Sequence, residues 1–123
     1  MIHDGYLTLL RDQLDGADAQ VIVHDGEWAA TPEQTVVSEM DGILARQDVT
    51  LEATLTSGVL LVGWEETVSI DIDSAPVVGG WVLALDGASD ALRVILKSAV
   101  YEGGDPVDPF PIVLAGGAFR VVR

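Results

Sequence analysis

Turn-forming dipeptides recur along the whole chain and divide it into short segments. Asp-Gly occurs five times, starting at residues 4, 15, 25, 41 and 86, and Gly-Gly three times, starting at 79, 103 and 116. Both favour backbone with positive φ, which glycine adopts without strain, so we interpret them as turns. Short apolar segments between regularly spaced turns are typical of antiparallel sandwiches and barrels. The spacing therefore predicts a mainly β fold, an antiparallel β-sandwich of the jelly-roll kind.

The length and composition fit a single domain over residues 1–123. Single domains cluster near ~100–150 residues. Hydrophobic residues make up 49% of the chain and the mean hydropathy is +0.36, which excludes the apolar-poor composition of disordered chains. No run of ~18 apolar residues occurs, and the N-terminus lacks the cationic and apolar regions of a signal peptide. We therefore expect a soluble domain with no signal peptide and no membrane span.

Helical spacing is confined to the N-terminus. Asp4 precedes apolar residues spaced three or four apart, and Asp15-Gly16 supplies a stop, which predicts an amphipathic helix over residues 4–15. Residues 31–37 are ambiguous, because Thr31 to Gln34 resembles a capping-box helix start whereas 35–37 favours β structure. We expect a loop followed by a strand there.

The other segments carry β patterns. Strands are expected at 19–24, 43–54, 59–62, 67–73, 81–85, 91–96, 110–114 and 118–122. In the second of these, alternation places Val49, Leu51 and Ala53 on one buried face. Asp86 to Asp90 is expected to form the five-residue loop of a hairpin. The run 77–85 is apolar on both faces, which implies burial on both sides or an oligomer interface.

Acidic residues outnumber basic ones by 20 to 6, which gives a formal net charge of −14 and a pI near 4.1. Nucleic acids and anionic membranes are bound through Lys and Arg, so this balance argues against both as partners. Strong negative charge is best tolerated where salt screens the repulsion between carboxylates. The composition therefore favours a salt-loving source, with an ordinary acidic protein from a moderate habitat as the alternative.

Sequence motifs of catalysis are missing. The chain has no cysteine, hence no disulfide and no thiolate metal site. Neither a nucleophile elbow, a phosphate-binding loop, a dinucleotide fingerprint nor a zinc-protease motif occurs. The two histidines, His3 and His24, are interpreted as terminal and surface residues. We therefore expect no enzymatic activity and no cofactor.

Four aspartates are weak metal candidates. Asp71 and Asp73 share one face of an expected strand, about 6–7 Å apart, a separation that suits a shared cation or a glycosidase pair. The alternation, however, places both on the solvent face, where nothing raises the pKa of a general acid. Asp86 and Asp90 bound a loop that superficially resembles a calcium loop without matching its pattern. Solvated strand and turn residues are the preferred interpretation for all four.

Four other residues are candidates for an interface. Trp28 follows an Asp-Gly turn in an expected loop, where it either contacts a partner or packs beneath its own loop. Trp81 lies in an expected strand and is expected to belong to the hydrophobic core. Together with Val78, it is part of the run 77–85, which is apolar on both faces. Arg46 is one of few cations, and either pairs with a carboxylate of a neighbouring copy or forms an ion pair within the chain.

The segment 39–51 (EMDGILARQDVTL) resembles the "gly-tyr-ala-arg-gln … val-thr-phe" stretch of a family of small tailed-phage virion proteins. That family comprises minor tail, tail-fibre-like and head-decoration proteins. The N-terminal helix followed by 21–24, the segment 81–92, and Gly104-Asp105 with 112–121 resemble further landmarks of the family in the same order. The most distinctive match is Ala-Arg-Gln at 45–47. The loops at 24–28 and 78–81 depart from the family pattern.

This resemblance implies a sandwich fold, repeated copies on a virion and no catalytic residues. It predicts a non-enzymatic head-decoration or minor tail protein that forms a homo-oligomer, a trimer first, and contacts capsid or tail subunits. Together with the acidity it suggests a virus of a haloarchaeon or another salt-loving host. The alternative is a jelly-roll or lectin-like binding module that uses an acidic loop and Trp28 for a calcium-assisted sugar.

Overall fold

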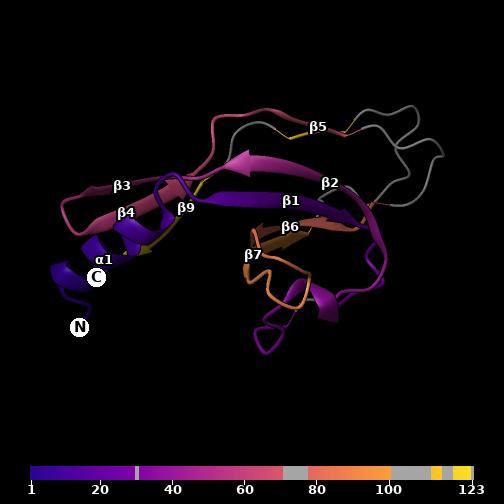
Figure 1. The fold of residues 1–123 in the computed structure, drawn as a ribbon, viewed down its shortest axis with the longest axis horizontal. Coiled ribbons are helices and arrows are strands. Elements are labelled where there is room, and N and C mark those ends of the chain that lie inside the picture. Colours follow the sequence, from indigo (N-terminus) through magenta and orange to yellow (C-terminus); the bar gives the residue numbers. More distant parts are fainter. Residues whose placement is uncertain (30, 71–77, 101–111, 115–117, 123) are drawn as a thin grey trace.

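A computed structural model of the chain describes residues 1–29, 31–70, 78–100, 112–114 and 118–122 (Figure 1). In chain order its elements are α1 (Asp4–Leu14), β1 (Asp18–His24), the 3-10 turn η1 (Val37–Glu39), β2 (Ile43–Thr50), β3 (Glu52–Thr56), β4 (Val59–Gly63), β5 (Val68–Ile70), β6 (Gly80–Leu85), β7 (Ile95–Val100), β8 (Ile112–Leu114) and β9 (Ala118–Val122). The predicted mainly β architecture with one short N-terminal helix is confirmed.

The strands form three antiparallel sheets. The largest has the order β2-β1-β6-β7, the second β3-β4-β9, and the third pairs β5 with β8. In Figure 1 the three-stranded sheet lies at one end of the molecule with α1 beside it, and β5 runs along β2. Each sheet thus combines strands that are distant in the sequence.

The N-terminal helix follows from its sequence. Asp4 lies in its first turn and Arg11 in its last, where each charge complements the helix dipole. Leu7 is fully buried against the three-stranded sheet, and Gly16 ends the helix with a φ of +77°. The interpretation of Asp4-Gly5 as a turn was wrong, because Gly5 is helical. Positive φ among the Asp-Gly pairs is found at residues 16, 26 and 42.

The expected strand over residues 43–54 is in fact two strands that belong to different sheets. At Leu51 the backbone N–H donates to Ala17 O at 2.9 Å, while Leu51 O accepts from Gly16 N–H at 2.8 Å. The Asp15 carboxylate also accepts a hydrogen bond from Ala53 N–H at 3.0 Å. The turn after α1 therefore takes the backbone groups that would have continued β2, and the chain crosses to the second sheet.

Two other strand predictions were wrong. Residues 91–94 belong to a long loop over 86–94, because Leu92 and Arg93 both donate backbone hydrogen bonds to Ser89 O, and β7 starts only at residue 95. Residues 35–37 do not form a strand but lead into η1, with a single β-bridge between Val36 and Val94. A short turn at Ser57-Gly58, with φ of +50° and +77°, joins β3 to β4. This turn was not predicted from the sequence.

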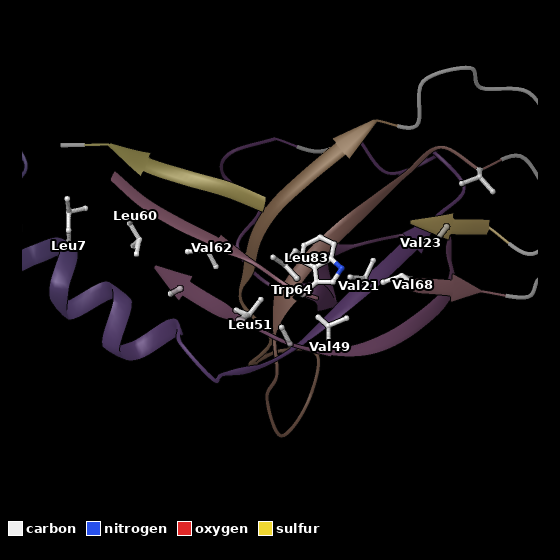
Figure 2. Close-up of a cluster of buried hydrophobic side chains, with 13 residues drawn as sticks. Leu7, Val21, Val23, Val49, Leu51, Leu60, Val62, Trp64, Val68 and Leu83 are labelled. Atoms are coloured by element: carbon white, nitrogen blue, oxygen red, sulfur yellow. The ribbon is translucent and has the colours of Figure 1, made fainter. Parts of the chain in front are cut away.

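Two apolar clusters cover the opposite faces of the four-stranded sheet. The inner cluster comprises Leu7, Ala19, Val21, Val23, Val49, Leu51, Ala53, Leu60, Val62, Trp64, Val68, Val78 and Leu83. The outer cluster comprises Ile22, Trp28, Val37, Met40, Val82 and Ala84. Figure 2 shows the inner cluster extending from Leu7 on α1 to Trp64 and Val68. Because adjacent residues of β1 and β6 enter opposite clusters, both central strands are buried on both faces.

The small sheet is attached to the large one through a side chain. The Gln47 amide oxygen accepts from Ser69 N–H at 3.1 Å, and its amide nitrogen donates to Thr67 O at 3.4 Å. One side chain of β2 thus occupies backbone groups next to and within β5, in the way a neighbouring strand would. Gln47 belongs to the Ala-Arg-Gln triplet, so this triplet has a structural role in the fold.

Candidate functional site

Arg46 of the same triplet points to the outer face and forms an ion pair within the chain. Its two terminal nitrogens lie 2.7 and 2.8 Å from the two carboxylate oxygens of Asp90, a bidentate pair. Arg93 Nη1 lies 2.6 Å from the same carboxylate, and Arg93 Nε lies 3.4 Å from Asp86. The two arginines hold the pKa of Asp90 at about 2, mainly through the hydrogen bond from Arg46. Of the two alternatives for Arg46, the structure contains the intrachain pair.

This network fixes the 86–94 loop on the sheet. Asp90 and Asp86 were weak cation candidates, and both carboxylates are instead engaged by arginine. The backbone of the loop is also bonded to the segment around η1: Val37 N–H donates to Arg93 O at 3.0 Å and Ser38 N–H donates to Asp90 O at 3.1 Å. Figure 1 shows this loop (orange) next to η1 (magenta). The loop is therefore held from two sides.

The fixed loop exposes apolar side chains. Leu92 is 61% exposed and Val94 is 45% exposed, although both lie in a loop held by charged and backbone contacts. Exposed single apolar residues are common, but a pair on a rigid loop differs from scattered ones, because little conformational entropy is lost when a partner covers it. This pair, with the ion-pair network beneath it, is one candidate interaction site.

A second candidate is the cleft beside His24. It has a volume of about 330 Å³ and is lined by His24, Trp28, Ser98 and small residues that include Gly26 and Gly79. The His24 and Trp28 rings meet edge to face, with centroids 5.4 Å apart. Trp28 is only 6% exposed, so it packs beneath its own loop, which was one of its two expected positions.

His24 is buried, which corrects its interpretation as a surface residue. The residue is 6% exposed, and its Nδ1 accepts a hydrogen bond from Gly26 N–H at 3.1 Å. Burial lowers the pKa of His24, and the nearby Asp25 carboxylate opposes this shift only in part. The imidazole is therefore neutral near pH 7. The burial of His24 could have been predicted, because residues 21, 22 and 23 are all apolar. A strand that is apolar at consecutive positions is covered on both faces, and residue 24 continues this strand.

Two glycines, Gly26 and Gly79, line this cleft and lie against each other. A Cβ on Gly79 would lie 2.1 Å from Gly26 Cα, which is too close for any real contact. Gly26 itself has a φ of +88°. The two backbones therefore pack directly against each other, and Gly79 N–H donates to His24 O at 2.8 Å. These glycines set the position of the loop that carries Trp28.

The other predicted interface residues lie in the inner core. Val78 is fully buried there, and Trp81 stacks edge to face on Trp64 with centroids 5.8 Å apart. The doubly apolar run is thus buried within the chain over its described part. Asp71 and Asp73 lie outside the described residues.

Acidic side chains line another cleft, of about 270 Å³. Asp18, Asp48, Glu66 and Asp86 contribute to it. Asp48 accepts from Gln20 at 3.1 Å, and Glu66 accepts from Thr50 N–H at 3.0 Å. With Asp86 paired to Arg93, three of these four carboxylates already have partners. Across the described ranges, no group of three or more His, Cys, Asp or Glu side chains is arranged to hold a metal ion.

No helix in the described part of the chain is both long and apolar enough to cross a membrane. Comparisons with protein-family models, with characterised proteins and with solved structures gave no match. The sites above therefore rest on the geometry of this chain alone.

Proposed function

We propose that the chain is a non-enzymatic structural subunit of a tailed-virus particle, a head-decoration or minor tail protein that acts through contacts between copies and with capsid or tail subunits. The observation that carries the contact function is the 86–94 loop, which is fixed by two arginines and exposes Leu92 and Val94. The virion assignment is supported by the resemblance of residues 39–51 and the later segments to small tailed-phage virion proteins.

The charge of the chain indicates the salt concentration at which such contacts form. With a net charge of −14, two copies repel each other unless salt shortens the range of the repulsion. At molar salt the screening length falls to about 3 Å, so apolar contacts between copies become favourable. The proposal therefore includes assembly at high salt, as in a virus of a salt-loving host.

The first test is the mass of the purified protein by multi-angle light scattering at ~2–4 M and at ~0.1 M salt, a range that changes screening strongly. We expect an oligomer at high salt that dissociates at low salt. Leu92→Asp should give a monomer at high salt. Ala91→Asp is the matched control, because it adds the same charge at an exposed neighbouring position, and it should leave the oligomer intact. A wild-type monomer at both salt concentrations contradicts the proposal.

The virion assignment has its own test. Virus particles purified from the source organism are analysed by mass spectrometry, and the chain should co-purify at a fixed ratio to the capsid or tail subunits. Recovery of the chain only from uninfected cells contradicts this part and leaves the contact function standing.

The lectin-like alternative has weaker support. A calcium-assisted sugar site needs free carboxylate oxygens on an acidic loop, and Asp86 and Asp90 are both paired with Arg93. A rise in melting temperature on adding calcium would favour this alternative, because a ligand that binds only the folded state stabilises it.

A further inference from the structure

The cleft beside His24 contains a hydrogen-bond donor without an acceptor. His24 Nδ1 accepts from Gly26 N–H, so the single proton of the neutral ring is on Nε2. Among the described residues, no side chain or backbone oxygen accepts a hydrogen bond from that Nε2–H. That N–H is therefore able to donate a hydrogen bond to a ligand in the cleft. Trp28 Nε1–H, on the ring that packs against His24, is buried and has no hydrogen-bond partner among the described residues.

The walls of the cleft exclude charged ligands. None of the described residues that line it, among them Ser98, Ala99 and Ala29, carries a charge at neutral pH. An anion would be repelled by the net charge of −14 and would find no cation to replace its hydration. The carboxylate of Asp25, which follows His24 in the chain, accepts a hydrogen bond from Glu27 N–H at 2.9 Å. The ligand that fits is therefore neutral and supplies an acceptor.

The size and polarity of the cleft further limit the chemical class of the ligand. A volume of about 330 Å³ is at the small end of the range for ligand sites, about 300–1,000 Å³. Among the described residues that line it, the polar side-chain groups are the imidazole, the Trp28 indole N–H and the Ser98 hydroxyl. A polyol would leave most of its hydroxyl groups unpaired there, at a cost for each. A carboxamide has an oxygen that can accept from the imidazole N–H, and an NH2 group that can donate one hydrogen to the Ser98 hydroxyl and the other to water.

We infer that this cleft binds the carboxamide group of a compact neutral ligand, whose oxygen accepts a hydrogen bond from His24 Nε2–H and whose apolar part contacts Trp28. The group has two sources, a free small molecule or a glutamine or asparagine side chain from a neighbouring subunit. The inference is independent of the proposed assembly function, because the described residues that line the cleft all come from one copy of the chain.

The test uses isobutyramide as the probe and isobutyrate, its anion of nearly equal shape, as the comparison compound. Nuclear magnetic resonance follows the imidazole signals of His24 and the indole N–H signal of Trp28 in the full chain. With isobutyramide we expect saturable shifts of both at about 1–100 mM, an affinity range suited to so small a ligand. Isobutyrate should give no saturable shift.

A matched pair of variants locates the binding. Ala29→Phe places a large ring at the cleft from an exposed loop position and should weaken binding at least ~10-fold, a loss of about 1.4 kcal/mol. Ala88→Phe makes the same change at an exposed position outside the cleft and should leave binding unchanged. Failure of isobutyramide to shift His24, or equal binding by the Ala29→Phe variant, overturns the inference.

The source of the group is decided by the oligomer mass of the Ala29→Phe variant at high salt. If binding is lost and the mass is unchanged, the natural ligand is a free small molecule. If binding and oligomer are lost together, the carboxamide belongs to a neighbouring copy. A wild-type monomer that still binds isobutyramide sinks the assembly function and leaves this inference intact.

Discussion

The two faces of the four-stranded sheet are built in different ways. On the inner face, buried residues from α1, from strands of all three sheets and from adjoining segments of the described chain form one continuous apolar cluster. On the outer face, the buried residues of the described chain are covered mainly by loops, and those loops are held by ion pairs, a buried histidine and a glycine contact. The inner face therefore depends on buried apolar area, whereas the outer face depends on a few specific contacts. Both candidate sites lie on the outer face.

The largest effect should come from the inner face. Leu83→Ala removes a fully buried side chain from the centre of the inner cluster and should cost about 2–5 kcal/mol in free energy of unfolding, measured by urea denaturation at high salt. Leu61→Ala, the same change at a half-exposed position, should stay within about 0.5 kcal/mol. Met40→Ala in the outer cluster should cost less than Leu83→Ala, because a loop can settle into the space. An equal cost would break the comparison between the faces.

The next effect should come from the glycine contact. Gly79→Ala forces a Cβ onto the backbone at Gly26 and should cost about 1–3 kcal/mol, as overpacking does. The same variant should shift the indole N–H signal of Trp28, because the loop that carries it must move. Gly5→Ala is the control, since Gly5 is helical with open space around it and should gain up to about 1 kcal/mol. An unchanged Trp28 signal in Gly79→Ala would mean that the loop is not set by this contact.

A smaller effect is expected from the ion-pair network. Asp90→Asn should cost about 0.2–1 kcal/mol at low salt and less at high salt, because the carboxylate is partly exposed. The pKa of Asp90, about 2, is below its ordinary value of 3.8, so its stabilising contribution is present above pH 4 and is lost as the pH falls through about 2. Asp12→Asn, at an exposed pair with Arg11, should change stability less. Equal losses would show that the loop is not held by Asp90.

The smallest effect is expected just below neutral pH. Because the pKa of His24 is lowered in the folded state, the unfolded chain binds its proton more readily. Stability should therefore be complete above about pH 6.5, the ordinary histidine value, and should decrease as the pH falls toward the pKa of the folded chain. Nuclear magnetic resonance titration of the His24 ring checks this. A midpoint above 6.5 would contradict the burial of the neutral ring.

Local patterns predicted most of the elements but few of the contacts between them. The helix, the strand 19–24 and the burial of the described part of 77–85 follow from spacing that can be read within a few residues. The break at Leu51 could not be predicted that way, because it is caused by a hydrogen bond from Gly16 N–H and another to Ala17 O, residues more than thirty positions away in the sequence. The alternation across residues 49, 51 and 53 continues through the break and hides it.

The candidate sites were predicted less completely, for the same reason. Arg46 and Trp28 were singled out as unusual residues, but their partners Asp90 and His24 are joined to them by tertiary contacts. Asp90 was considered for a cation because it is acidic and in a loop, and only the structure places two guanidinium groups on it. The role of Arg93 could not be predicted, since an isolated arginine in a predicted strand is not part of any sequence pattern.

The passage of one continuous chain segment from the first sheet to the second at Leu51 has a consequence for folding. Once β2 has paired with β1, the start of β3 is fixed directly after Leu51. Formation of the first sheet therefore also positions an edge strand of the second sheet. The search for long-range strand pairs, which makes β proteins slow to fold, is shortened accordingly. Because the inner cluster also joins these two sheets, unfolding of either should extend to the other, so that the two sheets melt together as one cooperative unit.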